Sequence, residues 1–336
     1  MTNNQNNPFY NKIILITGGT GSIGASLVTE LIKYQPKQIR IFSRDQNKQY
    51  ELIETFNHHP NLRLLIGDIR DEKRLNLALE NVDIIFHAAA LKHVPSCEYN
   101  PFEAVKTNII GSQNVIEVAL ARGVEKVIAI STDKVVNPTN VMGTSKLMME
   151  KLFISANYYR GSEHTKFACV RFGNVTWSNA SVLPLWKKQI EKNSEIRITD
   201  KNMTRFFISR EQAAQLVLEA AGLMQGGEVF VLKMPSIKLI NLAKLFIAKH
   251  ASNQKINIKL VGNRGNEKIH EGLFSEADIQ NQIFENKEML IILPHQTQFI
   301  NLSNRNYPGF KPISSKTAIK LSSAKNINIS EIRKII

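Results

Sequence analysis

Short apolar runs rich in isoleucine, leucine and valine alternate with longer amphipathic segments through the first half of the chain. The runs occupy residues 13–17, 38–42, 62–66, 83–87, 126–131 and 166–172. Strand-length apolar runs separated by helical segments are typical of parallel βαβ units. The pattern therefore predicts an α/β fold built on a doubly wound parallel sheet, most of it in residues 1–175.

In the second half the pattern loosens and the apolar runs are shorter. They lie at residues 194–198, 227–231 and 255–259. We expect residues 176–336 to form a smaller α/β lobe with a C-terminal tail, while segments between about 206 and 246 return to the main core. Residues 100–123 are predicted to form one helix that contains Asn108. The pattern supports no assignment beyond about residue 273.

A glycine-rich loop follows the first apolar run and leads into a helical segment. In this context the first glycine allows a tight turn, the second lets the backbone approach a pyrophosphate, and the third lets the helix pack closely on the strand. The loop therefore predicts a dinucleotide site of the Rossmann type, with a flexible loop as the alternative. The residues assigned to the nucleotide are Gly18, Thr20, Gly21, Ser22, Ile23 and Gly24.

The end of the second apolar run indicates which dinucleotide binds. Ser43, Arg44 and Lys48 offer a hydroxyl and two cations, which suit the 2′-phosphate of NADP. Asp45 lies between them, and a shift of one residue would place its carboxylate against the ribose, as NAD requires. A solvated charged turn is the remaining alternative. We predict NADP as the cofactor.

Two further run ends are expected to contact this cofactor. Asp68 and Ile69 follow the third run, where Asp68 faces the adenine amino group or caps the helix that begins near Asp71. Small side chains close the fourth run and let the backbone pass near a nucleotide. These residues are Ala88, Ala89 and Ala90.

The stretch after the fifth run carries the strongest indication of chemistry. Thr132, Asp133 and Lys134 place a hydroxyl, a carboxylate and an amine at the carboxyl end of a buried strand, where open α/β sheets bind ligands. Such groups serve as hydrogen-bond donor, acid and base. Lys146 lies four residues after Met142 on the next expected helix, so both face the same side. Met142 is the unusual member, because a thioether transfers no proton.

Composition narrows the class of protein. The net charge is +14, yet no basic run, zinc spacing or RNA-binding strand motif occurs, so neither nucleic acid nor a metal is expected as a partner. The two cysteines are too few for a disulfide framework. The polar start resembles no signal peptide, and no apolar run has the length of a membrane span. We expect a cytoplasmic protein without a membrane partner.

Together with further motifs elsewhere in the chain, these residues give the sequence a resemblance to the extended short-chain dehydrogenase/reductase superfamily. Within it, the sequence resembles the UDP-N-acetylglucosamine 4,6-dehydratases of polysaccharide biosynthesis. The resemblance covers about residues 10–272. Two departures occur. Met142 replaces the tyrosine of Tyr-x-x-x-Lys, as in some branches, and Arg264-Gly-Asn-Glu267-Lys replaces Arg-Pro-Gly-Glu-Lys. The additional motifs are His87-Ala-Ala-Ala-Leu-Lys-His-Val-Pro95, Glu98-Tyr-Asn-Pro101, Lys106-Thr-Asn108, Arg171-Phe-Gly-Asn174, Met203-Thr-Arg-Phe206 and Glu267-Lys-Ile-His-Glu271.

The resemblance implies a lyase reaction on UDP-N-acetylglucosamine, in which NADP takes a hydride from C4 and returns it to C6 after water is lost across C5 and C6. It implies that Thr132 bonds O4, Asp133 protonates the leaving hydroxyl and Lys134 removes the C5 proton. Lys134 must then be neutral, and we expect desolvation and the charge of Lys146 to lower its pKa. Lys146 is also expected to hold the nicotinamide ribose, and Asn108 to bond backbone at a helix distortion.

The same resemblance assigns a set of residues to the UDP-sugar and implies a fork of Arg205 on phosphate. The set is Lys92, His93, Asn174, Arg205, Arg264 and Glu267. For Lys92 and His93, covering a loop is an equally supported role. The alternative roles are a helix or turn cap for Asp133 and a core filler for Met142. A homo-oligomer is expected, and Met142 favours retention of configuration at C5. The rival functions are an inverting 4,6-dehydratase/5-epimerase, a nucleotide-sugar 4-epimerase and a non-catalytic NADP- or UDP-sugar-binding regulator.

Overall fold

The computed structural model describes most of the 336 residues. The described ranges are 7–159, 164–262, 266–295, 305–314, 322–325 and 327–336. Arg264, which the resemblance assigns to the substrate, lies outside them. None of the helices in these ranges combines the length and hydropathy of a membrane span.

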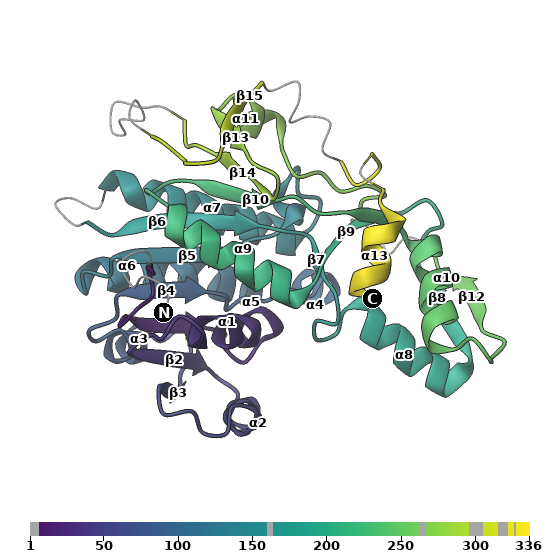
Figure 1. The fold of residues 1–336 in the computed structure, drawn as a ribbon, viewed down its shortest axis with the longest axis horizontal. Coiled ribbons are helices and arrows are strands. Elements are labelled where there is room, and N and C mark those ends of the chain that lie inside the picture. Colours follow the sequence, from purple (N-terminus) through teal and green to yellow (C-terminus); the bar gives the residue numbers. More distant parts are fainter. Residues whose placement is uncertain (1–6, 160–163, 263–265, 296–304, 315–321, 326) are drawn as a thin grey trace.

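A ten-stranded sheet forms the centre of the molecule, in the order β15-β13-β14-β10-β6-β5-β4-β1-β2-β3 (Figure 1). The six predicted runs become parallel strands, with β10 (Val229–Leu232) also parallel beside β6, and each of the six observed strands agrees with its run to within one residue at either end. The strands are β1 (Ile13–Thr17), β2 (Gln38–Ser43), β3 (Leu62–Ile66), β4 (Ile84–His87), β5 (Lys126–Ile130) and β6 (Lys166–Arg171). Helices cover both faces, so the central strands are apolar nearly throughout. The prediction of a doubly wound parallel sheet is confirmed.

Two helical layers enclose this sheet. On one face α1 (Ser22–Ile32) packs against α9 (Arg210–Leu223). On the other face α6 (Gly111–Ala121) packs against both α3 (Glu72–Ala78) and α7 (Val141–Tyr159). The strand order reverses between β1 and β4, and in folds of this kind the crevice at such a reversal holds the ligand.

The prediction of one helix over residues 100–123 is wrong. The segment contains α5 (Pro101–Ala104), a π-helix at Val105–Ile110 and then α6, and α4 (Val94–Tyr99) precedes it. Asn108 lies in the wide turn, where its Oδ1 accepts from the Leu91 N–H at 2.8 Å and its Nδ2 donates to the Leu91 carbonyl at 3.0 Å. Single π-turns of this kind occur inside α-helices and often lie at functional sites. The predicted backbone bonding of Asn108 is confirmed.

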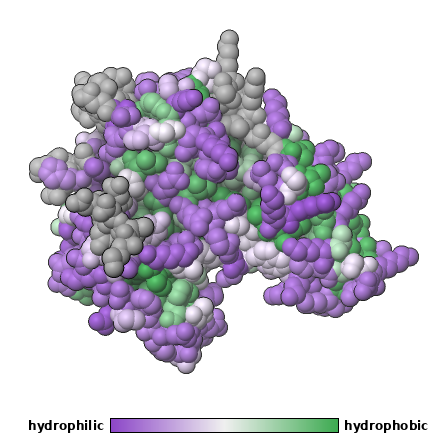
Figure 2. Space-filling model, in the orientation of Figure 1, coloured by the Kyte–Doolittle hydropathy of each residue, from purple (hydrophilic) through white to green (hydrophobic). Residues whose placement is uncertain are grey.

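A smaller lobe has its own apolar core around Trp186 and Phe246. The notch between it and the sheet is visible in a mostly hydrophilic surface (Figure 2). Two small sheets form the lobe, β11-β9-β7 and β12-β8. Their strands and the associated helices are β7 (Asn174–Val175), β8 (Glu195–Ile198), β9 (Thr204–Ile208), β11 (Ser236–Lys238), β12 (Asn257–Leu260), α8 (Val182–Asn193), α10 (Leu239–His250) and α13 (Ile329–Ile335).

The residues beyond 273 extend the main sheet, although the sequence pattern supported no assignment there. They supply α11 (Glu276–Ile279) and three antiparallel strands next to β10 (Val229–Leu232). The strands are β13 (Ile283–Glu285), β14 (Met289–Ile292) and β15 (Lys311–Ile313). A buried ion-pair network ties this region to the core, since Arg171 bonds both Glu150 at 2.7 Å and Asp278 at 2.8 Å.

Candidate functional site

A cavity of about 700 Å³ opens at the carboxyl ends of β1, β2, β4 and β5 and extends to the loop after β7. All of the residues assigned to the dinucleotide line it, from the glycine loop to the alanines after β4. So do Thr132, Lys134, Met142, Lys146 and Asn174. The structure thus brings the two parts of the predicted site into one continuous space.

The glycine loop is built for close approach of backbone to backbone. Gly18 has a φ of +65°, and a Cβ there would lie 2.7 Å from the Ala89 nitrogen. A Cβ on Gly24 would lie 2.5 Å from the Gly18 carbonyl oxygen. Gly21 caps α1 without a side-chain hydrogen bond, so the first N–H groups of the helix remain free to bind an anion. These features fit the pyrophosphate of a dinucleotide.

At the ribose end, the carboxylate of Asp45 is already engaged. It caps α2 (Gln46–Thr55) by accepting from the Lys48 N–H at 3.1 Å, and it pairs with Lys48 Nζ at 3.2 Å. Backbone and side-chain contacts of Lys48 hold the pKa of Asp45 below its ordinary value. Ser43 is buried and accepts from Gln49 at 2.9 Å, whereas Arg44 is half exposed at the rim. The group left to meet a phosphate is therefore the Arg44 guanidinium.

Asp68 is also engaged by cations rather than by a helix end. It bonds Arg70 at 2.6 Å and lies 3.6 Å from Arg44. Burial acts to raise the pKa of Asp68, but the hydrogen bonds from Arg70 outweigh it and the net shift is downward. The cap of α3 is Asp71, which accepts from the Arg74 N–H at 3.0 Å. Of the two roles considered for Asp68, the structure excludes capping.

The hydroxyl, carboxylate and amine after β5 form one hydrogen-bonded group. Thr132 Oγ1 donates to Asp133 Oδ1 at 2.9 Å, and Lys134 Nζ donates to the same oxygen at 2.9 Å. Lys134 also donates to Asn174 Oδ1 at 3.2 Å. Asp133 is fully buried, and among the described residues its Oδ2 has no hydrogen-bond partner. Asp133 itself lines neither cavity, so its link to the first cavity is the hydroxyl of Thr132 and its link to both cavities is the amine of Lys134.

The expectation that the site holds Lys134 neutral needs a correction. Burial does act to lower the pKa of Lys134, but the adjacent Asp133 charge outweighs it, with a further contribution from Glu271. The net pKa is raised, so Lys134 is an ammonium in this state. Lys146, which was expected to depress that pKa, is not among the main causes of the shift.

Lys146 and Met142 occupy the first turns of α7, beside the cavity. Lys146 Nζ donates to the Ile130 carbonyl and to Met149 Sδ. Burial lowers the pKa of Lys146 to about 8. Met142 packs against Cys97 and Ala104 in a small apolar cluster. The thioether thus fills core space and also borders the cavity.

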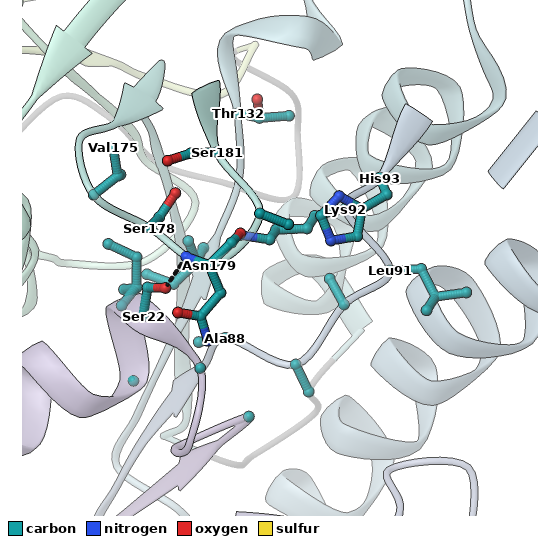
Figure 3. Close-up of a pocket in the computed structure, with 18 of the residues that line it drawn as sticks. Ser22, Ala88, Leu91, Lys92, His93, Thr132, Val175, Ser178, Asn179 and Ser181 are labelled. Carbon is teal, nitrogen blue, oxygen red and sulfur yellow. Dashed lines mark hydrogen bonds between the residues drawn. The ribbon is translucent and has the colours of Figure 1, made fainter. Parts of the chain in front are cut away.

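The loop after β7 closes over the glycine loop, and sequence analysis missed it. Ser22 Oγ accepts from the Asn179 N–H at 2.9 Å, and Lys92 Nζ donates to the Asn179 carbonyl at 2.9 Å (Figure 3). Burial lowers the pKa of Lys92 and of the adjacent His93. For Lys92, the loop-covering role is the one seen here. The only signal in the sequence was the position of this loop directly after Asn174.

A second cavity of about 250 Å³ adjoins the first, and Lys134 and Asn174 line both. Glu267 lines it too, as do Lys268, Arg205 and Glu271. The expected phosphate fork of Arg205 is not what the structure shows. Its two terminal nitrogens donate to backbone carbonyls of Thr204, Lys268 and Ile269 at 2.8, 2.9 and 3.2 Å. The guanidinium is therefore used to shape the cavity wall.

Sequence analysis assigned no role to Glu271, although this residue ends the motif Glu267-Lys-Ile-His-Glu271. It is 4% exposed and lies at the floor of the second cavity. In the described ranges no group of three or more histidine, cysteine, aspartate or glutamate side chains is arranged to hold a metal ion.

Comparison with known proteins shows that this chain is similar to enzymes named for reactions of nucleotide-linked sugars. A family model described as polysaccharide biosynthesis protein matches residues 14–293. A UDP-N-acetylglucosamine 4,6-dehydratase (inverting) of Campylobacter jejuni is 47% identical over 272 residues, which are 80% of this chain and 79% of the relative. A UDP-glucose 4-epimerase of Rickettsia bellii is 37% identical over 98% of this chain and 96% of the relative. The X-ray structure of Pen from Bacillus thuringiensis has 42% identity, 98% coverage of both chains and a TM-score of 0.86.

Proposed function

This chain belongs to the polysaccharide biosynthesis protein family, and we propose that within it the protein is a UDP-N-acetylglucosamine 4,6-dehydratase that uses NADP. The observation that carries the proposal is the bonded group of Thr132, Asp133 and Lys134, in which Thr132 lines the first cavity, Lys134 lines both, and the buried Asp133 bonds to each of them. A dehydration needs an acid for the leaving hydroxyl and a base for the neighbouring carbon. The 47% identical dehydratase of Campylobacter jejuni supports the choice of substrate.

When bound, the dinucleotide would supply the hydride acceptor for oxidation at C4 and the hydride donor for reduction at C6. The glycine loop and the α1 N-terminus would hold its pyrophosphate, and Lys146 would hold the nicotinamide ribose. Because Met142 offers no base, the proton of the C4 hydroxyl needs another acceptor. Thr132 already donates to Asp133, so a proton taken from O4 can pass through the Thr132 hydroxyl to the Asp133 carboxylate.

This transfer prepares Asp133 for the elimination. As an anion Asp133 cannot donate, but once it carries the O4 proton it becomes the acid that the C6 hydroxyl needs to leave as water. Lys134 removes the C5 proton, which the neighbouring C4 ketone has made acidic, and gives it back after the hydride reaches C6. The O4 proton thus ends in the released water, and the C5 proton returns to the sugar.

The second candidate function is a nucleotide-sugar 4-epimerase, favoured by the Rickettsia bellii relative. An epimerase oxidises C4 and reduces it again, so it needs no acid and no base beside C5 and C6. Asp133 would still take the O4 proton in that reaction, but the amine of Lys134, which the dehydration uses at C5, has no task there, and its desolvation would be costly without one. We therefore rank the dehydratase first.

We expect the purified protein to convert UDP-N-acetylglucosamine into a product lighter by one water molecule, without added cofactor, because the hydride is returned in each turnover. Mass spectrometry of the nucleotide-sugar pool measures this. UDP-N-acetylgalactosamine, with an unchanged mass, would instead be the product of an epimerase, and chromatography separates it from the substrate. No change of any kind with nucleotide-loaded protein would contradict both enzymatic functions.

The same incubation reports the configuration at C5. Lys134 removes and returns the proton on one face, and the apolar Met142 supplies no proton to the opposite face, so we propose retention. The Campylobacter jejuni relative is named as inverting. The C5 proton coupling in the NMR spectrum distinguishes the D-xylo from the L-arabino ketosugar, and an L-arabino product would remove Met142 as the cause of retention.

We expect NADP to bind more tightly than NAD by about 1.5–3 kcal/mol, the usual strength of a hydrogen bond to a charged group. The reason is that Arg44 is half exposed at the rim, with only the longer 3.6 Å pair to Asp68 among the described residues, while Asp45 is occupied as a helix cap. Calorimetric titration of nucleotide-free protein measures both affinities, and Arg44→Ala should remove most of the difference. Lys37→Ala, on the loop before β2 and outside the cavity, is the matched control. Equal affinities in the native protein would contradict NADP preference.

A further inference from the structure

Glu271 presents a buried carboxyl group to the cavity that Lys134 and Asn174 line. Its Oε2 is inaccessible to solvent and has no hydrogen-bond partner among the described residues. The nearest cations are Arg205, whose Nε lies 3.9 Å from Oε1, and Lys268, whose Nζ lies 3.9 Å from Oε2. Both distances are too long for hydrogen bonds. A buried polar atom of this kind requires a functional explanation.

The main chain of Glu271 is held much more firmly than its carboxyl group. Ser323 Oγ accepts from the Glu271 N–H at 2.8 Å, and the Ser323 N–H donates to the Glu271 carbonyl at 2.8 Å. Ser323 Oγ also lies 2.7 Å from the hydroxyl of Thr204 on β9. The C-terminal segment therefore fixes the position of Glu271, while the side chain keeps an oxygen free for exchange.

The proposed reaction does not yet include an acceptor for the ammonium proton of Lys134. Asp133 and Lys134 begin as an ion pair, and the C4 oxidation adds the O4 proton to Asp133. Asp133 is then an acid and can take no second proton. Lys134 is still an ammonium, yet it must be neutral before it can remove the C5 proton. Asn174, its other partner, is an amide and cannot act as the acceptor.

We propose that Glu271 is the proton acceptor for Lys134, taking its ammonium proton before the elimination and returning it after the product forms. The proposal rests on the dehydratase function above. In the first transfer an N–H bond of Lys134 breaks and an O–H bond of Glu271 forms, which leaves Lys134 neutral and Glu271 uncharged. The final transfer restores the starting ion pair. The second cavity has room for a water molecule to link the two groups.

The surroundings of Glu271 suit this exchange. Burial is the main cause that raises its pKa, and the charge of Asp133 acts in the same direction. Lys134, Arg205 and Lys268 oppose the shift, but the net pKa is raised. When Asp133 is protonated and Lys134 becomes neutral, Glu271 loses one negative and one positive neighbouring charge at the same time. A carboxyl group whose pKa lies above that of an ordinary glutamate both accepts and returns a proton readily.

A purely structural role for Glu271, as counter-ion to Arg205, Lys268 and Lys134, predicts the opposite pH effect. A counter-ion stabilises the ammonium form of Lys134, so its removal would lower the pKa of that amine and extend activity to lower pH. Removal of a proton acceptor instead makes Lys134 release its proton to solvent. Activity then falls at neutral pH and recovers as the pH rises. The direction of the shift separates the two roles.

The test compares native enzyme with Glu271→Gln, which keeps shape but cannot take the proton. At neutral pH we expect kcat to fall about 10²-fold or more. The rising limb of the plot of kcat against pH should move to higher pH. In a single turnover, reduced nicotinamide should accumulate, because C4 oxidation needs only Thr132 and Asp133. Glu191→Gln, which removes an exposed carboxylate on α8 outside both cavities, is the control, and its pH profile should match the native one.

A Glu271→Gln profile that keeps the native limb, or moves it to lower pH, would overturn the proposal. Glu271→Asp, which retains a carboxyl group, should keep the native profile at a reduced rate, and it serves if the glutamine variant does not fold. An aspartate variant whose limb moves to higher pH would count equally against the proposal. Absence of dehydration by the native enzyme is a separate outcome, because it contradicts the proposed function before Glu271 is tested.

Discussion

Replacing Asp133 with asparagine is expected to reduce turnover by roughly 10²–10⁴-fold, the range for loss of a general acid or base, and to fall near the upper end. Asparagine matches the shape of aspartate but neither accepts the O4 proton nor donates to the C6 hydroxyl. Both the oxidation and the elimination therefore suffer. The affinity for UDP-N-acetylglucosamine, measured by calorimetry, should change little, because the nucleotide contacts lie elsewhere in the cavities.

Single-turnover measurements tell this result from a general loss of structure. In Asp133→Asn, reduced nicotinamide should form slowly and no water should be lost. Thr132→Val keeps the side-chain shape but removes the hydroxyl between O4 and Asp133, so it should slow the formation of reduced nicotinamide. Turnover of Asp133→Asn within tenfold of native would remove Asp133 from the reaction. A Thr132→Val variant that oxidises C4 at the native rate would remove the relay while leaving Asp133 as the acid.

The predictable part of this site comes from short stretches of sequence. Gly18 and Gly24 are six residues apart, on the loop after β1 and in the first turn of α1, and Thr132, Asp133 and Lys134 are consecutive, so the chain order alone brings each set together. The parallel strands could be predicted for a similar reason, since each is a compact apolar run. The carboxyl ends of parallel strands then bring these local sets to one edge of the sheet.

The missed features depend on contacts between distant parts of the chain. The environment of Glu271 is set by Ser323, and the guanidinium of Arg205 is occupied by carbonyls of residues 268 and 269. No local sequence pattern indicates either arrangement. The π-helix likewise contains Asn108, whose side chain bonds the backbone of Leu91, and a periodic apolar pattern does not indicate such a wide turn. The raised pKa of Lys134 follows from the geometry of its bond to Asp133, which composition cannot supply.

Replacing Lys146 with methionine is expected to make the nucleotide-free protein more stable at neutral pH by about 1–2 kcal/mol and to reduce turnover by about 10²-fold or more. Lys146 is buried, and burial lowers its pKa from 10.5 to about 8. Below pH 8 the folded protein therefore contains a buried ammonium group that is unfavourable there. Methionine fills similar space without charge, at the cost of one hydrogen bond to the Ile130 carbonyl.

The pH dependence fixes the sign of this prediction. Between about pH 8 and 10.5 the folded protein releases the Lys146 proton while the unfolded chain still holds it, so the native protein gains stability as the pH rises. The advantage of Lys146→Met should therefore be full below pH 8 and shrink across that window. Urea unfolding at several pH values measures it, with Lys151→Met, an exposed lysine on the same helix, as the control. A Lys146→Met variant less stable than native at pH 7 would show that the ammonium group contributes to folding. Higher stability with lost turnover would show that native Lys146 is kept for its function at the expense of folding stability.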